Sequence, residues 1–245
     1  MAQQALDSPE GNAVLAADIQ QFVTVNDVTE RYRGIPFPGT FMLDPQGRVT
    51  SRFFEDFYRE RSTVTNLMLR LGTADAPVQA TEVDGAQLTL RTYPSDPVVA
   101  LGNRFTLVLD ITPKPDMHVY APGAAGYRVI ALTIDPQPFV RTLSVQFPAS
   151  EIYYFEPLDE RVPVYQKPFT LLQEVVPEVT AEAIAAFRGQ DKLTLSGRLD
   201  YQACDHTICY NPTSIPLSWT VGLQPFVPGA PREGGGGSSG GAGQR

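Results

Sequence analysis

The sequence has little of several features that define common classes of protein. Its 245 residues include two cysteines, two histidines and one tryptophan, and the formal net charge is −8. Binding to nucleic acid or to an anionic membrane needs a concentrated basic face. Because no such face is visible in this acidic chain, the composition argues against both kinds of partner.

Long apolar runs are also missing. No stretch approaches the roughly 18 consecutive apolar residues that are needed to cross a bilayer. The chain opens with MAQQALDSPEGN, which lacks both the basic and the apolar region of a secretory signal. We therefore expect no membrane span in this chain, and we see no export signal in it.

The residues that are present favour β structure. Twenty-two prolines and many short apolar runs with a period of two predict a mainly β protein rather than a helical bundle or repeated βαβ units. One short helix is predicted over residues 180–188, with Thr180 as its N-cap and Gly189 just past its end. Seven predicted strands fit a two-sheet sandwich, and they cover residues 87–92, 104–112, 127–134, 143–147, 169–176, 192–203 and 215–221.

Composition divides the chain into three parts. A helical pattern with Ser62 as its N-cap ends at Gly72, which places a boundary near residue 75. The last residues are rich in glycine and have almost nothing to bury, so they predict a flexible tail. The expected organisation is an N-terminal segment over 1–74, a β-sandwich over 75–225 and a disordered tail over 226–245.

The N-terminal segment carries a short resemblance of its own. Residues 38–44 and 49–54 are predicted strands around a tight turn at 45–48, and a helix follows. The run IPFPGTFMLDPQGRV resembles the second half of a thioredoxin-like or peroxiredoxin-like domain, in which a cis proline precedes a strand, and Pro38 matches that proline. The resemblance implies a small α/β fragment. The half of that fold that carries the active cysteines has no counterpart, so this segment cannot perform thiol chemistry by itself.

The positions of the two cysteines follow from an alternating pattern. One face of the predicted strand that starts at residue 192 is apolar, and Cys204 falls on the other, polar face. We therefore expect its sulfur to point away from the main core. The apolar face comprises Leu193, Leu195, Leu199, Tyr201 and Ala203.

A bond between Cys204 and Cys209 is geometrically possible only on strands. Residues five apart on a helix point roughly 140° from each other, whereas a hairpin brings the Cβ atoms within about 4 Å. Closing so short a loop stabilises the fold by only about 2 kcal/mol, so a reactive role explains the pair better than a structural one. Protonated His206 would favour a thiolate and Asp205 would oppose it, which leaves the order of attack open.

Three segments together resemble the N-terminal domain of the DsbD family of thiol:disulfide interchange proteins. They are ITPKPDMHVYAPG, YYFEPLDERVPVYQKPFTL and DYQACDHTICYNPTSIPL, and the resemblance covers about residues 80–222. It implies an immunoglobulin-like β-sandwich in the bacterial periplasm. Such a domain takes electrons from a membrane domain and passes them to disulfide isomerases and cytochrome-maturation thioredoxins.

The resemblance also implies site residues. Cys204 and Cys209 match the active pair, and Phe155 is the best match for an aromatic residue on a cap loop, with Leu158 as the alternative. The other residues expected to line or cover the pair are His118, Tyr120, Tyr201, His206 and Tyr210. The acidic residues of the intervening segment are interpreted as a solvated loop face, and they are Glu151, Glu156, Asp159 and Glu160.

Two functions compete on this evidence. The first is a protein-disulfide reductase that relays electrons to thioredoxin-like proteins or disulfide isomerases, uses no cofactor beyond its disulfide and depends on a separate membrane donor. The second is a non-enzymatic immunoglobulin-like binding module with an inert structural disulfide. Metal binding is a weaker alternative, because Cys-x-His-x-x-Cys is not a recognised chelating spacing.

Overall fold

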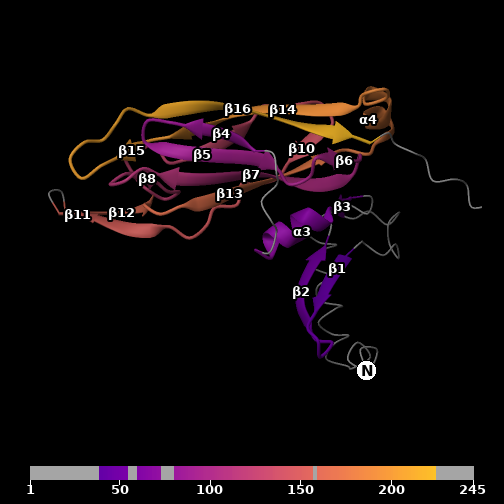
Figure 1. Ribbon diagram of the computed structural model, residues 1–245, viewed down its shortest axis with the longest axis horizontal. Helices are drawn as coiled ribbons and strands as arrows, with labels where there is room; N and C mark the ends of the chain where they lie inside the picture. The colour runs from indigo at the N-terminus through magenta and orange to yellow at the C-terminus, as the bar shows by residue number, and fades with distance from the viewer. Residues whose placement is uncertain (1–38, 55–59, 73–79, 157–158, 225–245) are drawn as a thin grey trace, which may run out of the picture.

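The computed structural model describes residues 39–54, 60–72, 80–156 and 159–224, and its main body is a sandwich of β-sheets (Figure 1). One layer is an antiparallel sheet in the order β10-β13-β7-β5-β4. These strands are β4 (Thr81–Asp84), β5 (Leu88–Pro94), β7 (Asn103–Pro113), β10 (Val140–Thr142) and β13 (Phe169–Pro177), and a sixth, short strand, β3 (Arg61–Ser62), pairs parallel with β7.

Two four-stranded sheets make up the rest of the sandwich. One has the order β6-β16-β14-β9 and the other the order β11-β12-β8-β15. The chain passes from β14 through a single residue into β15, so the second of these sheets continues one end of the first. Their strands are β6 (Val98–Val99), β8 (His118–Tyr120), β9 (Ala131–Ile134), β11 (Glu151–Phe155), β12 (Glu160–Tyr165), β14 (Lys192–Tyr201), β15 (Ala203–Cys204) and β16 (Thr213–Leu223).

The predicted mainly β sandwich is confirmed, and so is the short helix α4 (Ala181–Ala186) with Thr180 as its N-cap. The predicted strand at 143–147 is wrong, because only an isolated bridge between Gln146 and Leu172 forms there. The side-chain amide of Gln173, rather than a backbone N–H, donates to the Leu143 carbonyl and interrupts the ladder. The strand predicted at 127–134 is reduced to its second half, β9.

The core lies between the two layers. Alternate residues of β14 pack inward, and Leu195 and Leu199 are 1% and 0% exposed. The indole N–H of Trp219 on β16 donates to the Thr92 hydroxyl on β5 at 2.8 Å, so the layers are also joined by a satisfied buried hydrogen bond. Gly197 is required where β14 pairs with β9, because a Cβ there would lie 2.4 Å from a backbone oxygen of β9.

The N-terminal segment forms a hairpin and a helix. Strands β1 (Gly39–Leu43) and β2 (Val49–Phe54) pair antiparallel, and the carboxylate of Asp44 accepts two backbone N–H groups in the turn between them. The helix α3 (Val64–Arg70) is capped by Thr63, so the prediction of Ser62 as N-cap is off by one residue. The reason is that Ser62 belongs to β3 (Arg61–Ser62), which pairs with β7 of the sandwich.

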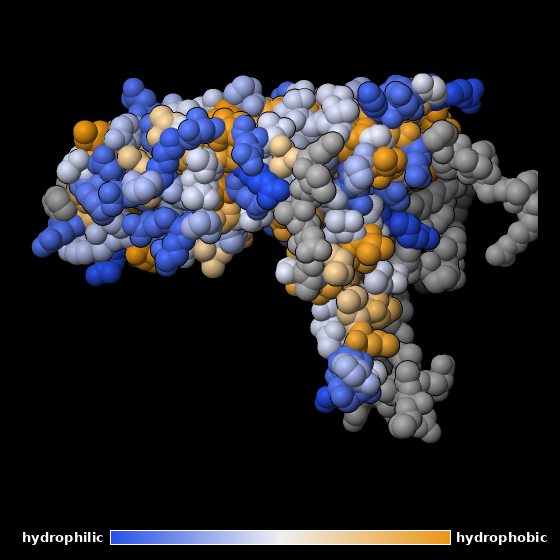
Figure 2. All heavy atoms as spheres, in the orientation of Figure 1, coloured by the Kyte–Doolittle hydropathy of each residue, from blue (hydrophilic) through white to orange (hydrophobic). Residues whose placement is uncertain are grey.

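A buried polar cluster attaches this segment to the sandwich. Asn66 of α3 is 0% exposed, and its amide donates to Arg104 O and to the Glu174 carboxylate, both at 3.2 Å. Arg104 in turn forms an ion pair with Glu60 at 3.1 Å. The helix therefore buries an asparagine, while the apolar Val64 at its first position is 76% exposed. The hairpin of β1 and β2 projects from the sandwich below α3 (Figure 1), and Figure 2 shows hydrophobic residues on the surface of this part.

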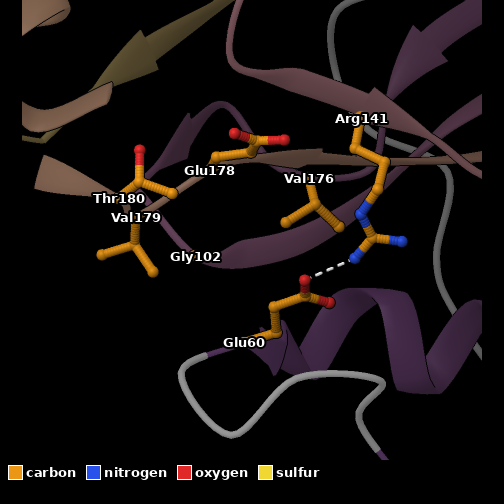
Figure 3. A pocket seen from close by; sticks show the side chains of 7 residues that line it. All are labelled: Glu60, Gly102, Arg141, Val176, Glu178, Val179 and Thr180. Atoms are coloured by element: carbon orange, nitrogen blue, oxygen red, sulfur yellow. Dashed lines mark hydrogen bonds and ion pairs between the residues drawn. The ribbon is translucent and has the colours of Figure 1, made fainter. Parts of the chain in front are cut away.

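A pocket of about 310 Å³ lies beside this junction (Figure 3). Glu60 and Arg141 form an ion pair at its edge, and no cysteine lines it. Its lining residues are Glu60, Gly102, Arg141, Val176, Glu178, Val179 and Thr180.

Several predictions about the chain's organisation remain predictions. Pro38, the boundary near residue 75 and the tail over 226–245 lie outside the described residues. The resemblance of the N-terminal segment to half a thioredoxin domain is compatible with the hairpin and helix, but no further observation supports it.

Candidate active site

A tight loop brings the two cysteines together at the end of the sandwich where β15 ends. The carboxylate of Asp205 accepts the backbone N–H groups of Thr207 and Ile208 at 2.7 Å each, and the hydroxyl of Tyr210 at 3.0 Å. The two backbone bonds are the main reason that the pKa of Asp205 lies well below its usual range, so the carboxylate stays ionised. The loop is thereby fixed in the shape that a short disulfide needs.

Cys204 and Cys209 are joined by a disulfide, as predicted, with 4.1 Å between their Cα atoms. The parity argument is also correct, because Cys204 does not join the main core. It packs instead in a second, smaller cluster, and it is 1% exposed. Cys209 is exposed. One sulfur-bearing residue is therefore shielded and the other faces solvent. The buried members of the second cluster are Tyr120, Ala124, Val162, Val164 and Cys204.

Tyr120 lies directly against the disulfide. Its hydroxyl is 3.0 Å from Sγ of Cys204 and 3.5 Å from Sγ of Cys209. Burial, and after it the proximity of Tyr127, raises the pKa of Tyr120 above its ordinary value. The phenol therefore stays protonated at neutral pH and can donate a hydrogen bond to a sulfur.

A second tyrosine supports the first. The rings of Tyr120 and Tyr127 are stacked with their centroids 4.0 Å apart. The Tyr127 hydroxyl donates to the Glu160 carboxylate at 2.6 Å, and this bond is the largest cause of a raised pKa of Tyr127. Glu160 is thus a partner of the site rather than part of a solvated acidic face.

His118 is the cross-strand neighbour of Cys204 in the β8–β15 pair. Its ring lies edge-on to Tyr120, with centroids 5.5 Å apart, and tilted against Tyr153 at 4.5 Å. The side chain is buried, and its Nδ1 has no hydrogen-bond partner among the described residues. Burial, followed by the nearby His206, lowers the pKa of His118 below 6.5, so the ring is neutral at neutral pH.

The hairpin formed by β11 and β12 covers this group. Tyr153 on β11 contacts His118, and its hydroxyl lies 3.3 Å from Nδ1 of His206 in the loop between the cysteines. Phe155 is two residues further along the same strand, half-buried like Tyr153 and paired with Glu160. Leu158 lies outside the described residues.

Of the remaining predicted residues, two lie at the disulfide loop and one does not. Tyr210 supports the loop through Asp205, and His206 is exposed, with Nε2 3.9 Å from the Asp116 carboxylate. The expectation that Tyr201 packs against the pair needs correction. Tyr201 lies in the main core and donates to the Gln87 side chain at 3.2 Å, because strand parity sends it to the face opposite Cys204.

Sequence reasoning missed three residues around the disulfide, namely Tyr127, Tyr153 and Glu160. For Tyr153 a signal exists, since it alternates with Phe155 along β11 and therefore shares its face. For Tyr127 no local signal exists, because it lies in an irregular segment before β9.

The described part of the chain contains no group of three or more His, Cys, Asp or Glu side chains placed to hold a metal ion. Within the same residues, no helix has the length and apolarity needed to span a bilayer.

Residues 89–216 match the family model described as thiol:disulfide interchange protein DsbD, N-terminal. The chain belongs to this family. DsbD N-terminal domains carry out thiol:disulfide exchange through a cysteine pair and need no further cofactor, and the family is periplasmic. The match begins at residue 89, so it includes Cys204 and Cys209 but none of the N-terminal segment.

Two solved structures are similar to the chain. The N-terminal periplasmic domain of ScsB from Proteus mirabilis has 14% sequence identity and a TM-score of 0.41, over 56% of this chain and 48% of that one. The chain thus spans about half the length of that structure. The reduced DsbD N-terminal domain of Neisseria meningitidis has 17% identity and a TM-score of 0.32, over 48% of this chain and 82% of that one. A search of the curated proteins gave no match.

Proposed function

We propose that this DsbD-family chain is a periplasmic electron-relay domain that reduces disulfides of thioredoxin-like proteins or disulfide isomerases. A dithiol on a separate membrane protein would supply the electrons. The observation that carries the proposal is the disulfide itself, which lies on a short fixed loop with Cys209 exposed and Cys204 shielded. A bond that closes so short a loop stabilises the fold by only about 2 kcal/mol, which supports a reactive role.

The difference in exposure gives the order of the steps. A donor thiolate attacks Sγ of Cys209, the bond between the two sulfurs breaks, and Cys204 leaves as a thiolate beside the Tyr120 hydroxyl. The second donor thiol, after losing its proton, attacks the donor sulfur of this mixed disulfide. The donor becomes a disulfide, and the relay domain holds the pair of electrons as two thiols after taking up two protons.

Transfer to the partner runs through the same sulfur. The Cys209 thiolate attacks the partner disulfide and releases one partner thiolate. Cys204 then attacks Sγ of Cys209, which reforms the internal disulfide and releases the second partner thiolate. The two protons lost by the cysteines go to the two partner sulfurs, so electrons and protons balance.

The hairpin has a protective role in this scheme. Tyr153 contacts His118 on β8 and reaches His206 in the disulfide loop, so it bridges β8 and that loop. A reduced pair that is open to solvent would be oxidised by other disulfides. The hairpin must move when the partner binds, as lids do in other enzymes.

The binding-module alternative is favoured by one observation, the near-complete burial of Cys204. Redox titration separates the two functions. A structural disulfide has a reduction potential below about −300 mV, whereas a relay lies in the range of oxidoreductases, roughly −120 to −270 mV. A value in the lower range would overturn the relay proposal.

Trapping provides the direct test. The full chain with Cys204→Ala is mixed with an oxidised thioredoxin-like protein, and we expect a stable mixed disulfide through Cys209 on a non-reducing gel. The matched variant Cys209→Ala should form little or none, because its remaining cysteine is shielded. The proposal would be contradicted if Cys204→Ala formed no trapped complex and the reduced wild-type chain did not reduce the disulfide of the partner.

A further inference from the structure

Two residues outside the cysteine pair and its immediate lining form a continuous contact path to the disulfide. The path runs from Glu160 through its 2.6 Å hydrogen bond to the Tyr127 hydroxyl, and from the Tyr127 ring through a 4.0 Å stack to Tyr120. It ends at Sγ of Cys204, 3.0 Å from the Tyr120 hydroxyl. The first and last contacts join residues that are 33 and 84 positions apart in the sequence.

The end of this path is where charge develops when the disulfide opens. Cys204 lies among Ala124, Val162 and Val164, so a thiolate at this position loses most of its hydration. A hydrogen bond from the Tyr120 hydroxyl offsets that loss, and bonds to charged groups are stronger than bonds between neutral ones. The benefit depends on the hydroxyl being held at the sulfur at the moment of bond cleavage.

Tyr120 does not hold itself in place by hydrogen bonding to the backbone, since its hydroxyl is directed to the sulfurs. Tyr127 orients it in two ways, because the Tyr127 ring is the stacked neighbour and the Tyr127 side chain is also a hydrogen-bond partner of Tyr120. Tyr127 is half-buried and lies in an irregular segment, so it depends on its bond to Glu160 to keep a fixed position.

We propose that Tyr127 and Glu160 are positioning residues, which act through the Tyr120 ring to hold its hydroxyl against Cys204 as that sulfur leaves. The inference rests on the proposed function to the extent that the disulfide opens and closes. The two residues also link the disulfide site to the hairpin of β11 and β12 that covers it. Glu160 is the first residue of β12 and pairs with Phe155 at the closing end of the hairpin.

This link has a mechanistic consequence. When a partner displaces the end of the hairpin, Glu160 moves with it and the bond to Tyr127 is released. The Tyr120 hydroxyl then loses its support, and the stabilisation of a thiolate at Cys204 falls. A less stabilised thiolate is a stronger nucleophile, which favours closure of the disulfide and release of electrons to the bound partner.

The test measures reduction of the full-length chain by dithiothreitol, so it needs no natural partner. Tyr120→Phe should slow reduction by roughly 10-fold or more, since hydrogen bonds to charged groups contribute about 1.5–3 kcal/mol. Tyr127→Phe and Glu160→Ala should slow it by a smaller factor, about 3- to 5-fold, and Glu160→Gln should recover most of that loss because its amide oxygen still accepts from Tyr127. In the reduced protein, the Cys204 thiol pKa, followed by the Cβ chemical shift, should rise in Tyr120→Phe and Glu160→Ala.

A double-mutant cycle decides whether the residues act through Tyr120. In the Tyr120→Phe background, Glu160→Ala should cause no further slowing, because there is no hydroxyl left to position. The control is Tyr154→Phe, which removes a similar hydroxyl-to-carboxylate bond, to Asp159 at 3.0 Å, from the exposed positions of the same hairpin. It should leave the rate unchanged.

Two results would overturn the inference. Equal slowing by Glu160→Ala in both backgrounds would show that it does not act through Tyr120, and slowing by Tyr154→Phe equal to that by Tyr127→Phe would show only a loosened hairpin. These results are distinct from failure of the relay. A chain that never exchanges with a thioredoxin-like protein would refute the proposed function while these rates with dithiothreitol still test the positioning.

Discussion

The two ends of the sandwich both bury polar side chains, but they satisfy them in different ways. At the junction with the N-terminal segment the buried groups are charged, and Arg104 forms ion pairs with Glu60 at 3.1 Å and with Glu174 at 3.9 Å. At the disulfide end the buried groups are neutral phenol, imidazole and disulfide, and one imidazole nitrogen has no partner among the described residues. Figure 1 places β8, β11, β12 and β15 together at one end, away from α3.

The difference shows what each end is suited to do. Removing one member of a buried ion pair leaves an uncompensated charge, so separating the two sides of the junction is costly. Neutral groups that exchange weak hydrogen bonds tolerate a change in one of them, such as the gain of two protons and two electrons at the disulfide. The junction therefore anchors the N-terminal segment, and the disulfide end can change state.

The largest expected effect is at the anchor. Arg104→Ala should destabilise the chain by about 3–5 kcal/mol, because the buried carboxylates of Glu60 and Glu174 lose the buried cation that they share and keep only the less buried Arg141 and Arg70. Urea unfolding at neutral pH measures the change. The control is Arg198→Ala, which breaks a half-exposed pair with Asp200 and should cost less than about 1 kcal/mol. A similar small loss for both variants would remove the distinction between the two ends.

The second prediction tests the cover at the other end. Tyr153→Ala removes the ring over His118 and the contact with His206, so the disulfide becomes more accessible. We expect reduction by dithiothreitol and air oxidation of the reduced pair both to accelerate, by about 10-fold for an effect of roughly 1.4 kcal/mol on the opening of the hairpin. Thiol titration over time measures both rates. Ile152→Ala, which alters an exposed side chain of the same strand, should leave them unchanged.

The smallest effect concerns pH and His118. Burial holds the folded-state pKa of His118 below 6.5, so below pH 6.5 the unfolded chain binds more protons than the folded chain and stability falls as the pH decreases. The ring faces His206, which disfavours its protonation, and Asp205, which favours it, and it packs on the phenols of Tyr120 and Tyr153.

His118→Leu should therefore lose less stability than the wild type between pH 7.5 and pH 5.5, as urea unfolding of the oxidised chain at the two pH values can show. A variant that loses as much as the wild type would mean that the imidazole is not kept neutral by its surroundings.

Much of the fold and part of the site could be predicted from local patterns. The alternation from Leu193 to Ala203 correctly separated Cys204 from the main core, and the same rule, applied to Tyr201, would have excluded it from the site. The sequence does not predict β6, β8 and β10. These strands have only two or three residues, which is too few to show the alternation of apolar and polar side chains that indicates a strand. The local pattern predicts Ser62 as the N-cap, one residue too early. The pairing of Ser62 with β7 joins residues far apart in the sequence, so no local pattern reveals it.

The sequence by itself determined the mainly β class, the loop that places Cys204 near Cys209, and the face to which Cys204 points. These follow from side-chain alternation and turn residues, which act over a few positions. Tertiary structure alone decided that Glu160 holds Tyr127, 33 residues away, and that Asn66 meets Glu174, 108 residues away. Such contacts depend on how the sheets pack, because folding brings together surfaces whose complementarity no short stretch of sequence contains.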